Sequence, residues 1–303
     1  KHNYLRISLT ERCNLRCFYC MPEEGVPLRD KKEFMSSEEV LLMAKTFVDL
    51  GVNKIRLTGG EPLIKKDAPN IIRQLGALPV ELTLTTNAVN ADSFIFVFKE
   101  AGIKSLNVSI DSLKPEIFNQ ISRRNFADKI ISNINLLLDE GFKIKLNVVL
   151  IKGINDSEII DFIKFTEHRN VEIRFIEFMP FDGNNWNWDK KVSFDEIISI
   201  SNKHFGTSQI ESLPLEVNHT SKNFRIKGYQ GSFGIISTLT NPFCDSCNRI
   251  RLTADGKIKN CLFLMSFEEV LFFQLFFLRM FINHVNQKRP RGSCKTYECF
   301  FFW

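Results

Sequence analysis

The sequence predicts an α/β protein whose parallel sheet is covered by helices. Six strand-like segments between residues 4 and 178 alternate with helical segments, and each connection is long enough to cross over to a parallel neighbour. Polar residues follow the strands, and folds of this class bind ligands at the carboxyl ends of their strands. The sheet is expected to be doubly wound or barrel-like. The chain of 303 residues is long enough for one large domain with an appendage, or for two ordinary domains.

The first repeat shows why each element is expected. Residues 4–10 form a short run typical of a strand. Ser36 and Glu39 form the signature of a helix N-terminus, and apolar residues follow them at helical spacing. Gly51 is expected to end this helix, and residues 54–58 begin the next strand.

The same alternation continues along the chain. Further strands are expected at residues 82–85, 105–110, 144–150 and 172–178, and helices at residues 93–101, 127–138 and 157–166. From Asp182 the composition changes to a polar, aromatic loop, so the repeat is expected to end there.

The composition is that of a globular protein. It is 44% hydrophobic and 25% charged, with a formal net charge of +5. This charge is too small and too dispersed to predict duplex nucleic acid as a partner. A Phe-rich run at residues 270–278 is shorter than the roughly 20 apolar residues that span a bilayer. Because residue 1 is Lys rather than Met, the sequence allows a targeting segment ahead of it.

Three thiols lie close together after the first strand, at Cys13, Cys17 and Cys20. Four-iron clusters are normally held by four Cys thiolates, so three thiols leave one iron open to a reactive ligand. Zinc is disfavoured because no His or fourth Cys lies near this loop. Disulfides are disfavoured because they need an oxidising compartment and usually a small, Cys-dense chain. The loop therefore predicts an iron–sulfur cluster with an open iron.

A second set of three thiols follows the repeat. It consists of Cys244, Cys247 and Cys261. Zinc remains an alternative for this set, with Cys294 or Cys299 as a fourth ligand. Arg249 and Arg251 alternate along a predicted strand and share one face beside the thiols. Arginine binds phosphate through two parallel hydrogen bonds, so this face suits an anionic ligand.

The predicted strand ends carry short polar motifs. They are Gly59-Gly60-Glu61-Pro62, Thr85-Thr86-Asn87, Ser109-Ile110-Asp111 and Glu177-Phe178-Met179-Pro180. The two glycines let the backbone approach a ligand closely, and Glu61 can accept from an amine or a ribose hydroxyl. A plain turn or capping loop explains each motif equally well when it is taken alone. Their common location at strand ends favours a binding site.

Together these motifs resemble the radical S-adenosylmethionine superfamily. The second cysteine set, with Asn248-Arg249-Ile250-Arg251, narrows the resemblance to the GTP 3′,8-cyclase family of molybdenum cofactor biosynthesis. The similarity extends over about residues 4–263. The loop at residues 179–184 resembles the eukaryotic, mitochondrial branch of that family.

The resemblance implies an α/β fold, an incomplete (βα)6 TIM-like barrel with a C-terminal extension that carries a second cluster. The implied divisions are a partial barrel at residues 1–180, a second-cluster and GTP-binding region at 181–263, and an atypical Phe-rich tail at 264–303. The implied cofactors are S-adenosylmethionine and two [4Fe–4S] clusters, one on each cysteine set. A radical made from S-adenosylmethionine abstracts the 3′ hydrogen of GTP, and C3′ then attacks C8 of the guanine to give 3′,8-cyclo-7,8-dihydro-GTP.

The resemblance also assigns residues and partners. Positions that match S-adenosylmethionine contacts are Tyr19, Gly59, Gly60, Glu61, Ser109 and Met179. Positions that match GTP contacts are Arg6, Arg56, Thr85, Lys145, Arg249 and Arg251. The implied partners are GTP, an electron donor and a downstream synthase that makes cyclic pyranopterin monophosphate, and a homodimer is compatible with the family. No nucleic acid or membrane partner is expected. The expected location is the mitochondrial matrix, or the cytoplasm if the source is prokaryotic.

Two departures from the family pattern define the alternatives. The family usually has Gly where this chain has Ala88, which matters if the position needs a positive φ. The family ends in a Gly-Gly tail needed for activity, whereas this chain ends in Phe301-Phe302-Trp303. The first hypothesis is an active cyclase, and the second is an impaired variant that binds clusters and GTP without turnover. A third hypothesis, from another class, is a zinc-bound nucleic-acid-binding module built on the second cysteine set.

Overall fold

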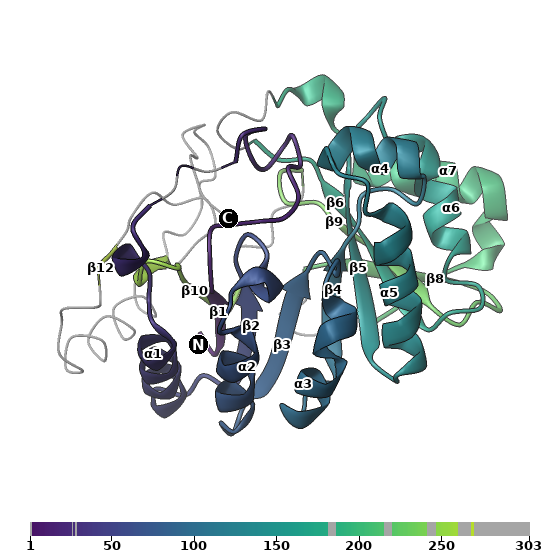
Figure 1. The fold of residues 1–303 in the computed structure, drawn as a ribbon. Helices are drawn as coiled ribbons and strands as arrows, with labels where there is room; N and C mark the ends of the chain where they lie inside the picture. Colours follow the sequence, from purple (N-terminus) through teal and green to yellow (C-terminus); the bar gives the residue numbers. More distant parts are fainter. Residues whose placement is uncertain are drawn as a thin grey trace.

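A single sheet of twelve strands organises the protein (Figure 1). The computed structural model describes residues 2–25, 27, 29–180, 186–214, 220–240, 247–259 and 268–269. The strand order is β12-β11-β10-β1-β2-β3-β4-β5-β6-β9-β8-β7. The eight strands from β10 to β9 are parallel to one another, and the pairs at both edges are antiparallel.

The bounds of the elements are as follows. The central strands are β1 (Tyr4–Ser8), β2 (Lys54–Thr58), β3 (Glu81–Thr86), β4 (Ser105–Ser109), β5 (Lys143–Leu150) and β6 (Val171–Glu177). The flanking and edge strands are β7 (Ile210–Ser212), β8 (Lys222–Ile226), β9 (Ser232–Ile236), β10 (Arg249–Leu252), β11 (Lys257–Lys259) and β12 (Glu268–Glu269). The α-helices are α1 (Ser37–Asp49), α2 (Ala68–Gly76), α3 (Ile95–Glu100), α4 (Pro115–Ser122), α5 (Ala127–Asp139), α6 (Ile159–Lys164) and α7 (Phe194–Phe205). Short 3-10 turns lie at Lys31–Glu33, Pro62–Ile64, Ala91–Phe94, Asp156–Glu158, Trp188–Lys190 and Thr207–Gln209.

The six strands expected from the sequence are confirmed, and they are neighbours in chain order. The capping box that begins α1 is also confirmed, because the Glu39 amide donates to Ser36 Oγ and the Ser36 amide donates to the Glu39 carboxylate. The expected helices at 93–101 and 157–166 are shorter than predicted, and each follows a 3-10 turn. Three helices, α2, α4 and α7, were not anticipated.

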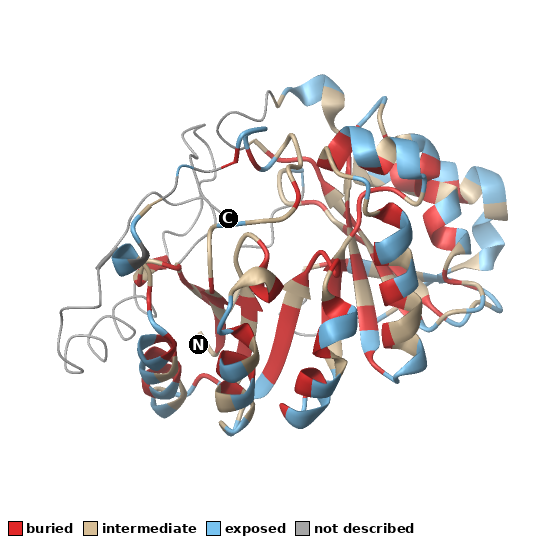
Figure 2. Cartoon of the chain, viewed as in Figure 1, coloured by how far each residue is buried: buried red, intermediate tan, exposed pale blue. Residues whose placement is uncertain are grey.

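The two faces of the sheet differ in chemistry. Leu5, Ile7 and Ile55 point toward the helices and are fully buried, whereas the alternate residues Arg6 and Arg56 face the other side and are partly buried. The helices follow one another along the outside of the curved sheet, from α1 to α6 and α7 (Figure 1). Buried residues are concentrated in the strands and on the helix faces that pack against them (Figure 2). The hydrophobic core therefore lies between sheet and helices, and the inner face is left for polar residues.

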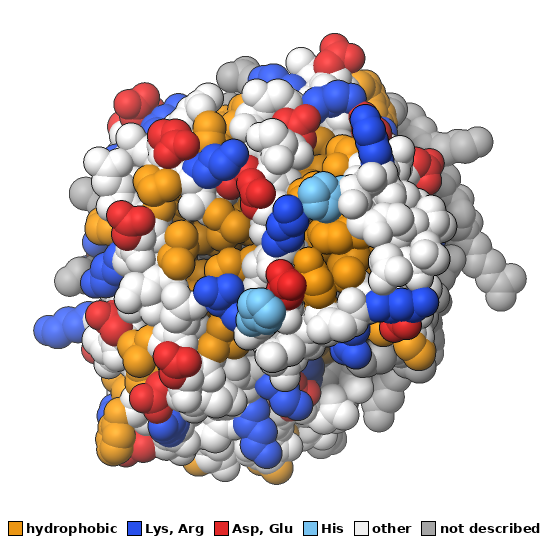
Figure 3. Space-filling model, turned by 90° about the vertical axis from the view of Figure 1, so that its right-hand side faces the viewer, with side chains coloured by type: hydrophobic (Ala, Val, Ile, Leu, Met, Phe, Trp, Pro, Cys, Tyr) orange, Lys and Arg blue, Asp and Glu red, His pale blue; other side chains and the backbone are white. Residues whose placement is uncertain are grey.

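The outer surface carries no predominant charge on the side shown in Figure 3, where acidic and basic side chains are interspersed around hydrophobic ones. Within the described part of the chain, no helix has both the length and the apolar character needed to cross a membrane.

Ala88 has a positive φ of 60° and is completely buried. Its amide donates to Thr86 Oγ1 and its carbonyl accepts from Asn133 Nδ2, so the loop after β3 is held in this conformation. For residues other than Gly, a left-handed backbone conformation costs about 1–2 kcal/mol of stability. Position 88 therefore requires a positive φ, the conformation for which the Gly usual in the family is suited.

We predict that Ala88→Val lowers the free energy of unfolding by about 2–4 kcal/mol, because a β-branched side chain adds overpacking to the backbone strain. Ala88→Gly is expected to change it by less than about 1 kcal/mol, since the relief of strain is offset by the lost methyl burial and by a more flexible unfolded chain. Urea unfolding of both variants measures the difference. A Val variant as stable as the wild type would contradict this account.

Candidate functional site

The first cysteine loop follows β1 and is anchored on the last turn of α4. The amides of Arg16 and Phe18 donate to the carbonyls of Ser122 and Ile121. Carbonyls in the last turn of a helix have no partner within the helix, so they are available as acceptors. Arg16 also donates from its guanidinium to the Cys13 carbonyl at 2.6 Å. The loop is thus held by hydrogen bonds to α4 and by one hydrogen bond within the loop itself.

The three thiols of this loop influence one another. Burial, then Asp111 and the other two thiols, raise the pKa of Cys17 well above its usual value. Burial and Cys13 raise the pKa of Cys20 to about 12. Three thiolates this close repel one another, and bound iron would offset that repulsion.

The donor set fits an iron–sulfur cluster. The Leu15 amide donates to Cys13 Sγ at 3.4 Å, and Asn87 Nδ2 lies 3.8 Å from the same sulfur. Hydrogen bonds to the sulfurs are one of the means by which proteins tune such clusters. Among the described residues, no three Cys, His, Asp or Glu side chains surround a point where a single metal ion would be held. A cubane binds each thiolate through a different iron, so its ligands lie further apart than those of one ion.

Glu61 joins the loops that follow β2 and β3. It is 1% exposed, and its carboxylate accepts from the Thr86 hydroxyl at 2.7 Å, the Asn87 amide at 2.6 Å and the Leu63 amide at 3.0 Å. Burial raises the pKa of Glu61 to about 7, although these hydrogen bonds act in the opposite direction. Its side chain therefore binds the chain's own loops.

Gly59 and Gly60 press against the residues that lead into the cysteine loop. The Gly60 amide donates to the Thr10 carbonyl at 2.7 Å, and a Cβ at Gly60 would lie 2.2 Å from the Arg12 carbonyl oxygen. A side chain cannot fit there, so this close approach requires glycine.

Tyr19 connects the cysteine loop to the far side of the site. Its hydroxyl donates to Asp111 at 2.6 Å, and its ring packs edge-on against Phe178 after β6. The other oxygen of Asp111 accepts from the Val149 amide. Ser109 ends β4, whereas Met179 follows Phe178 and is buried. The strand-end residues expected to meet S-adenosylmethionine thus lie around the same edge of the sheet.

Cationic side chains cross the inner face in direct register. Arg251 of β10 is opposite Arg6 of β1, which is opposite Arg56 of β2. Two residues closer to the amino ends of these strands, Tyr4 lies between Arg249 and Lys54. We call the first set, Arg251, Arg6 and Arg56, the arginine row.

Repulsion within this group is visible in the pKa values. Burial, then Arg251 and Arg249, hold the pKa of Arg6 at about 9. Burial, then Arg6, Arg174 and Arg249, hold the pKa of Arg56 at about 10. The guanidinium groups remain charged at neutral pH, and a bound anion would offset their repulsion.

Lys145 and Arg174 approach the same space from β5 and β6. Glu172 accepts from Lys145 Nζ at 2.9 Å and from Arg174 Nε at 2.6 Å, and the two cations lower the pKa of its carboxyl against the effect of burial. The sequence prediction included Lys145 and missed Arg174 and Glu172. Glu172 and Arg174 alternate with apolar residues along the predicted strand. This alternation was the sequence signal that could have identified them.

Several polar atoms on this face are buried without a hydrogen-bond partner among the described residues. They are Tyr4 Oη, Arg56 Nε and Thr85 Oγ1. An unpaired buried polar group costs about 1–3 kcal/mol, so such atoms indicate a site that a polar ligand completes.

One cysteine of the second set, Cys247, lies at the opposite end of the same strands. Cys247 precedes β10, which is parallel to β1, whereas Cys13 follows β1. The five residues of β1 place these two ends about 17 Å apart. Cys244 and Cys261 lie outside the described residues. The predicted common face of Arg249 and Arg251 is confirmed by the burial of Ile250 between them.

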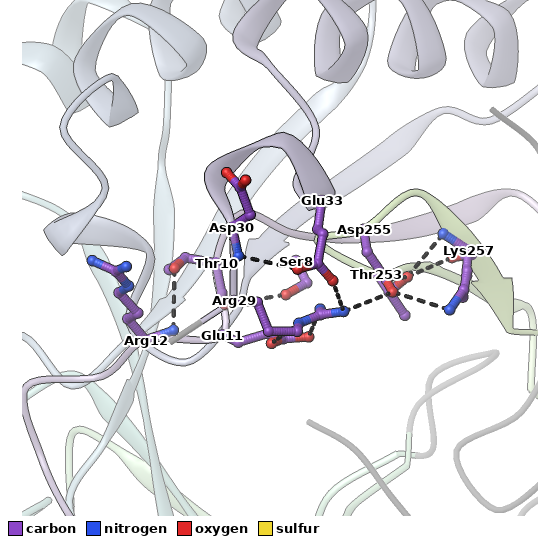
Figure 4. Close-up of polar contacts among 10 residues, drawn as sticks. All are labelled: Ser8, Thr10, Glu11, Arg12, Arg29, Asp30, Glu33, Thr253, Asp255 and Lys257. Carbon is purple, nitrogen blue, oxygen red and sulfur yellow. Dashed lines mark hydrogen bonds and ion pairs between the residues drawn. The ribbon is translucent and has the colours of Figure 1, made fainter. Parts of the chain in front are cut away.

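Arg29, in the segment after the cysteine loop, contacts the side chains of Glu11, Glu33 and Asp255 (Figure 4). Its guanidinium contacts both carboxylate oxygens of Glu11, at 2.5 and 3.2 Å, and lies 3.4 Å from Glu33 and 3.6 Å from Asp255. Glu11 precedes the cysteine loop, and Asp255 lies in the turn between β10 and β11. The regions that carry the two cysteine sets are thereby linked through one side chain.

Comparison with known proteins assigns both parts of the chain. Residues 7–166 match the Radical SAM superfamily, and residues 171–270 match the family described as Molybdenum Cofactor Synthesis C. Molybdenum cofactor biosynthesis protein 1 of Drosophila melanogaster is 45% identical over 264 residues, which cover 86% of this chain and 46% of that protein. The chain therefore spans about half the length of this relative.

Other relatives are shorter. The mitochondrial GTP 3′,8-cyclase of Arabidopsis thaliana is 46% identical over 266 residues, covering 86% of this chain and 67% of that protein. GTP 3′,8-cyclase of Listeria welshimeri is 45% identical over 267 residues, covering 86% and 80%. Among solved structures, Streptococcus suis SuiB has a TM-score of 0.63 at 15% identity, covering 86% of this chain and 60% of SuiB. That likeness concerns the fold alone.

We predict that Glu61→Gln lowers the free energy of unfolding by about 2–4 kcal/mol, because the amide group turns a donor toward groups that need an acceptor. Glu81→Gln is the matched control, since Glu81 is exposed and pairs with Lys54 at the surface, where such a pair contributes about 1 kcal/mol or less. Urea unfolding monitored by circular dichroism compares them. Equal effects of the two substitutions would contradict a joining role for Glu61.

Proposed function

Because the chain belongs to the radical SAM superfamily and, within it, to the GTP 3′,8-cyclase family, we propose that it converts GTP to 3′,8-cyclo-7,8-dihydro-GTP, the first step of molybdenum cofactor biosynthesis. The observation that carries this proposal is the arginine row, which lies between Cys13 at one end of the strands and Cys247 at the other. Cations in this position suit a substrate such as GTP. The triphosphate would contact the arginines, while the base and the ribose react.

Each cysteine set has a proposed cofactor. Cys13, Cys17 and Cys20 would hold a [4Fe–4S] cluster, which supplies the electron for reductive cleavage of S-adenosylmethionine and hence the radical that starts cyclisation. Cys244, Cys247 and Cys261 would hold a second cluster near the guanine.

The chain's own residues bind and orient the two small molecules. Arg6, Arg56, Arg249 and Arg251 would bind the triphosphate, and the unpaired Thr85 hydroxyl offers a hydrogen bond to the nucleotide. Charge-assisted contacts of this kind are strong in a shielded site.

Glu172 would position two further cations of this face. It holds Lys145 and Arg174 at fixed positions, so their donors need little reorganisation when the substrate binds.

The residues proposed to contact S-adenosylmethionine lie at the ends of the strands. They are Tyr19, Gly59, Gly60, Ser109 and Met179, with Glu61 acting through the loops it joins.

The proposed architecture is an incomplete barrel. In a flat sheet, β2 and β6 would lie four strand spacings apart, about 19 Å. Arg174 of β6 nevertheless lowers the pKa of Arg56 of β2, which supports a sheet curved around a common interior. We also propose a partial barrel at residues 1–180 and a second-cluster region at 181–263, followed by a tail at 264–303. The two family matches meet between residues 166 and 171, about ten residues before the first of these proposed boundaries.

The proposed partners and location of the protein are inferred from its relatives. The product would pass to a synthase that makes cyclic pyranopterin monophosphate, and an electron donor would reduce the first cluster. The name of the Arabidopsis relative supports a mitochondrial location, and the Listeria relative supports a cytoplasmic one if the source is prokaryotic. A homodimer is compatible with this proposal.

The decisive experiment is anaerobic incubation of the reduced, reconstituted protein with S-adenosylmethionine and GTP. We expect 5′-deoxyadenosine and 3′,8-cyclo-7,8-dihydro-GTP in equal amounts, both measured by liquid chromatography and mass spectrometry. Arg56→Met is expected to reduce the cyclised product at least tenfold at low GTP, because it removes a charged contact. Formation of 5′-deoxyadenosine without cyclised nucleotide would contradict an active cyclase and favour an impaired, GTP-binding variant.

Iron analysis tests the two cysteine sets separately. We expect Cys17→Ser and Cys247→Ser each to lose about half of the iron and sulfide of the reconstituted wild type, because each breaks one of two equal clusters. Cys294→Ser and Cys299→Ser are the controls and are expected to retain the full content. Zinc without sulfide on the second set, lost in either control, would instead indicate a four-ligand zinc site.

A further inference from the structure

Tyr4 is an aromatic residue on the cationic inner face, at the start of β1. It lies on the same side of the sheet as Arg6, because Leu5 between them packs against the helices. Its neighbours across the sheet are Arg249 of β10 and Lys54 of β2. Tyr4 is 9% exposed, so it is a buried member of the face on which the proposed substrate binds.

Two cations contact the ring of Tyr4. Lys54 Nζ lies 5.5 Å from the ring centroid, and the guanidinium carbon of Arg56 lies at the same distance. Such cation–π contacts use the face of the ring and leave the hydroxyl group available. Burial lowers the pKa of the Arg56 guanidinium and Tyr4 acts in the opposite direction, so the phenol oxygen lies near this group. The hydroxyl is therefore held among cations.

The hydroxyl itself has no hydrogen-bond partner among the described residues, although its oxygen is closed off from solvent. Glu81, the carboxylate next to Lys54 on β3, accepts from Lys54 Nζ at 2.7 Å and makes no hydrogen bond to Tyr4. Buried tyrosine hydroxyls usually have a partner, because an unpaired polar group away from water costs free energy. The Tyr4 hydroxyl therefore indicates a ligand, and the cations around it favour one with an anionic oxygen.

We propose that Tyr4 is a further substrate-binding residue, whose hydroxyl donates a hydrogen bond to a phosphate oxygen of the nucleotide. A phenol O–H bonded to an anionic oxygen forms a short, charge-assisted hydrogen bond. The arginine row would neutralise the charge of the phosphates, whereas the directional hydroxyl would fix the position of one oxygen. The identity of the nucleotide rests on the proposed function, and the phosphate contact rests on the burial and the surroundings of Tyr4.

Binding measurements on the reconstituted holoprotein without S-adenosylmethionine test this role. Tyr4→Phe removes only the hydroxyl and keeps the ring that Lys54 and Arg56 contact. We expect it to raise the Kd for GTP and for inorganic tripolyphosphate about tenfold, which is the effect of losing one charge-assisted hydrogen bond. The Kd for guanosine is expected to stay within about twofold of the wild type, because guanosine has no phosphate.

Tyr229→Phe is the matched control. It makes the same chemical change on a ring that packs against Phe205, in the turn between β8 and β9. These two strands lie beyond β6 in the sheet order, away from β1. The control should bind GTP, tripolyphosphate and guanosine like the wild type.

The thermal stability of the nucleotide-free holoprotein distinguishes a ligand contact from a structural one. If a ligand completes the hydroxyl, Tyr4→Phe should keep or raise the midpoint of thermal unfolding, because it removes an unpaired buried polar group. A midpoint lowered by more than about 2 °C would show that the hydroxyl has a partner within the fold, and it would overturn the inference.

The binding outcomes separate this inference from the proposed function. Wild-type affinity of Tyr4→Phe for GTP would overturn the inference and leave the cyclase proposal intact. Equal loss of GTP and guanosine binding would also overturn it, because the hydroxyl would then act on the base, the ribose or the fold. If Tyr4→Phe binds tripolyphosphate more weakly than the wild type but neither protein prefers GTP to ATP, the proposed function fails and the phosphate contact stands.

Discussion

The parallel pairing of β1 with both β2 and β10 is the constraint on which the rest of the site depends. It sets Arg251, Arg6 and Arg56 side by side, at a spacing that only adjacent strands provide. It also places Cys247 and Cys13 at opposite ends of neighbouring strands. A shift of one residue in this register would turn the arginines toward the helices and the aliphatic residues inward. The buried aliphatic face of β1 therefore determines where the polar site lies.

Buried carboxylates hold the loops around this framework. Glu61 accepts from the loop after β3, Asp111 from Tyr19 and from β5, Glu158 from Ser112 and the next amide, and Glu177 from the amides of residues 239 and 240. In each case the carboxyl oxygens accept hydrogen bonds from donors that are buried near a strand end. The loops that surround the proposed S-adenosylmethionine site are thus fixed by the chain itself before any ligand binds. Such preorganisation reduces the reorganisation that binding would otherwise require.

The parts of this site that could be predicted from the sequence are those encoded by local pattern. Cys13 to Cys20 are close in sequence, and the alternation of Arg249 and Arg251 shows their common face without any tertiary information. The position of β10 beside β1 depends on a pairing between residues more than 240 positions apart, which no local pattern contains. Glu61 was correctly singled out by its motif, but its hydrogen bonds to Thr86 and Asn87 became evident only in the fold.

The charge distribution of the inner face links substrate binding to stability. Arg6 and Arg56 are held together by the aliphatic residues behind them, although burial and mutual repulsion both lower their pKa values. An anion between the strands would remove much of that repulsion, so it would bind the folded chain far better than the unfolded one. Any ligand with this preference stabilises the fold in proportion to the logarithm of its concentration over its Kd. The repulsion between these cations would thus contribute to the affinity for the proposed polyphosphate substrate, and it accords with their position on the face opposite the helices. On the helix side, the hydrophobic core would exclude the anion that makes their proximity favourable.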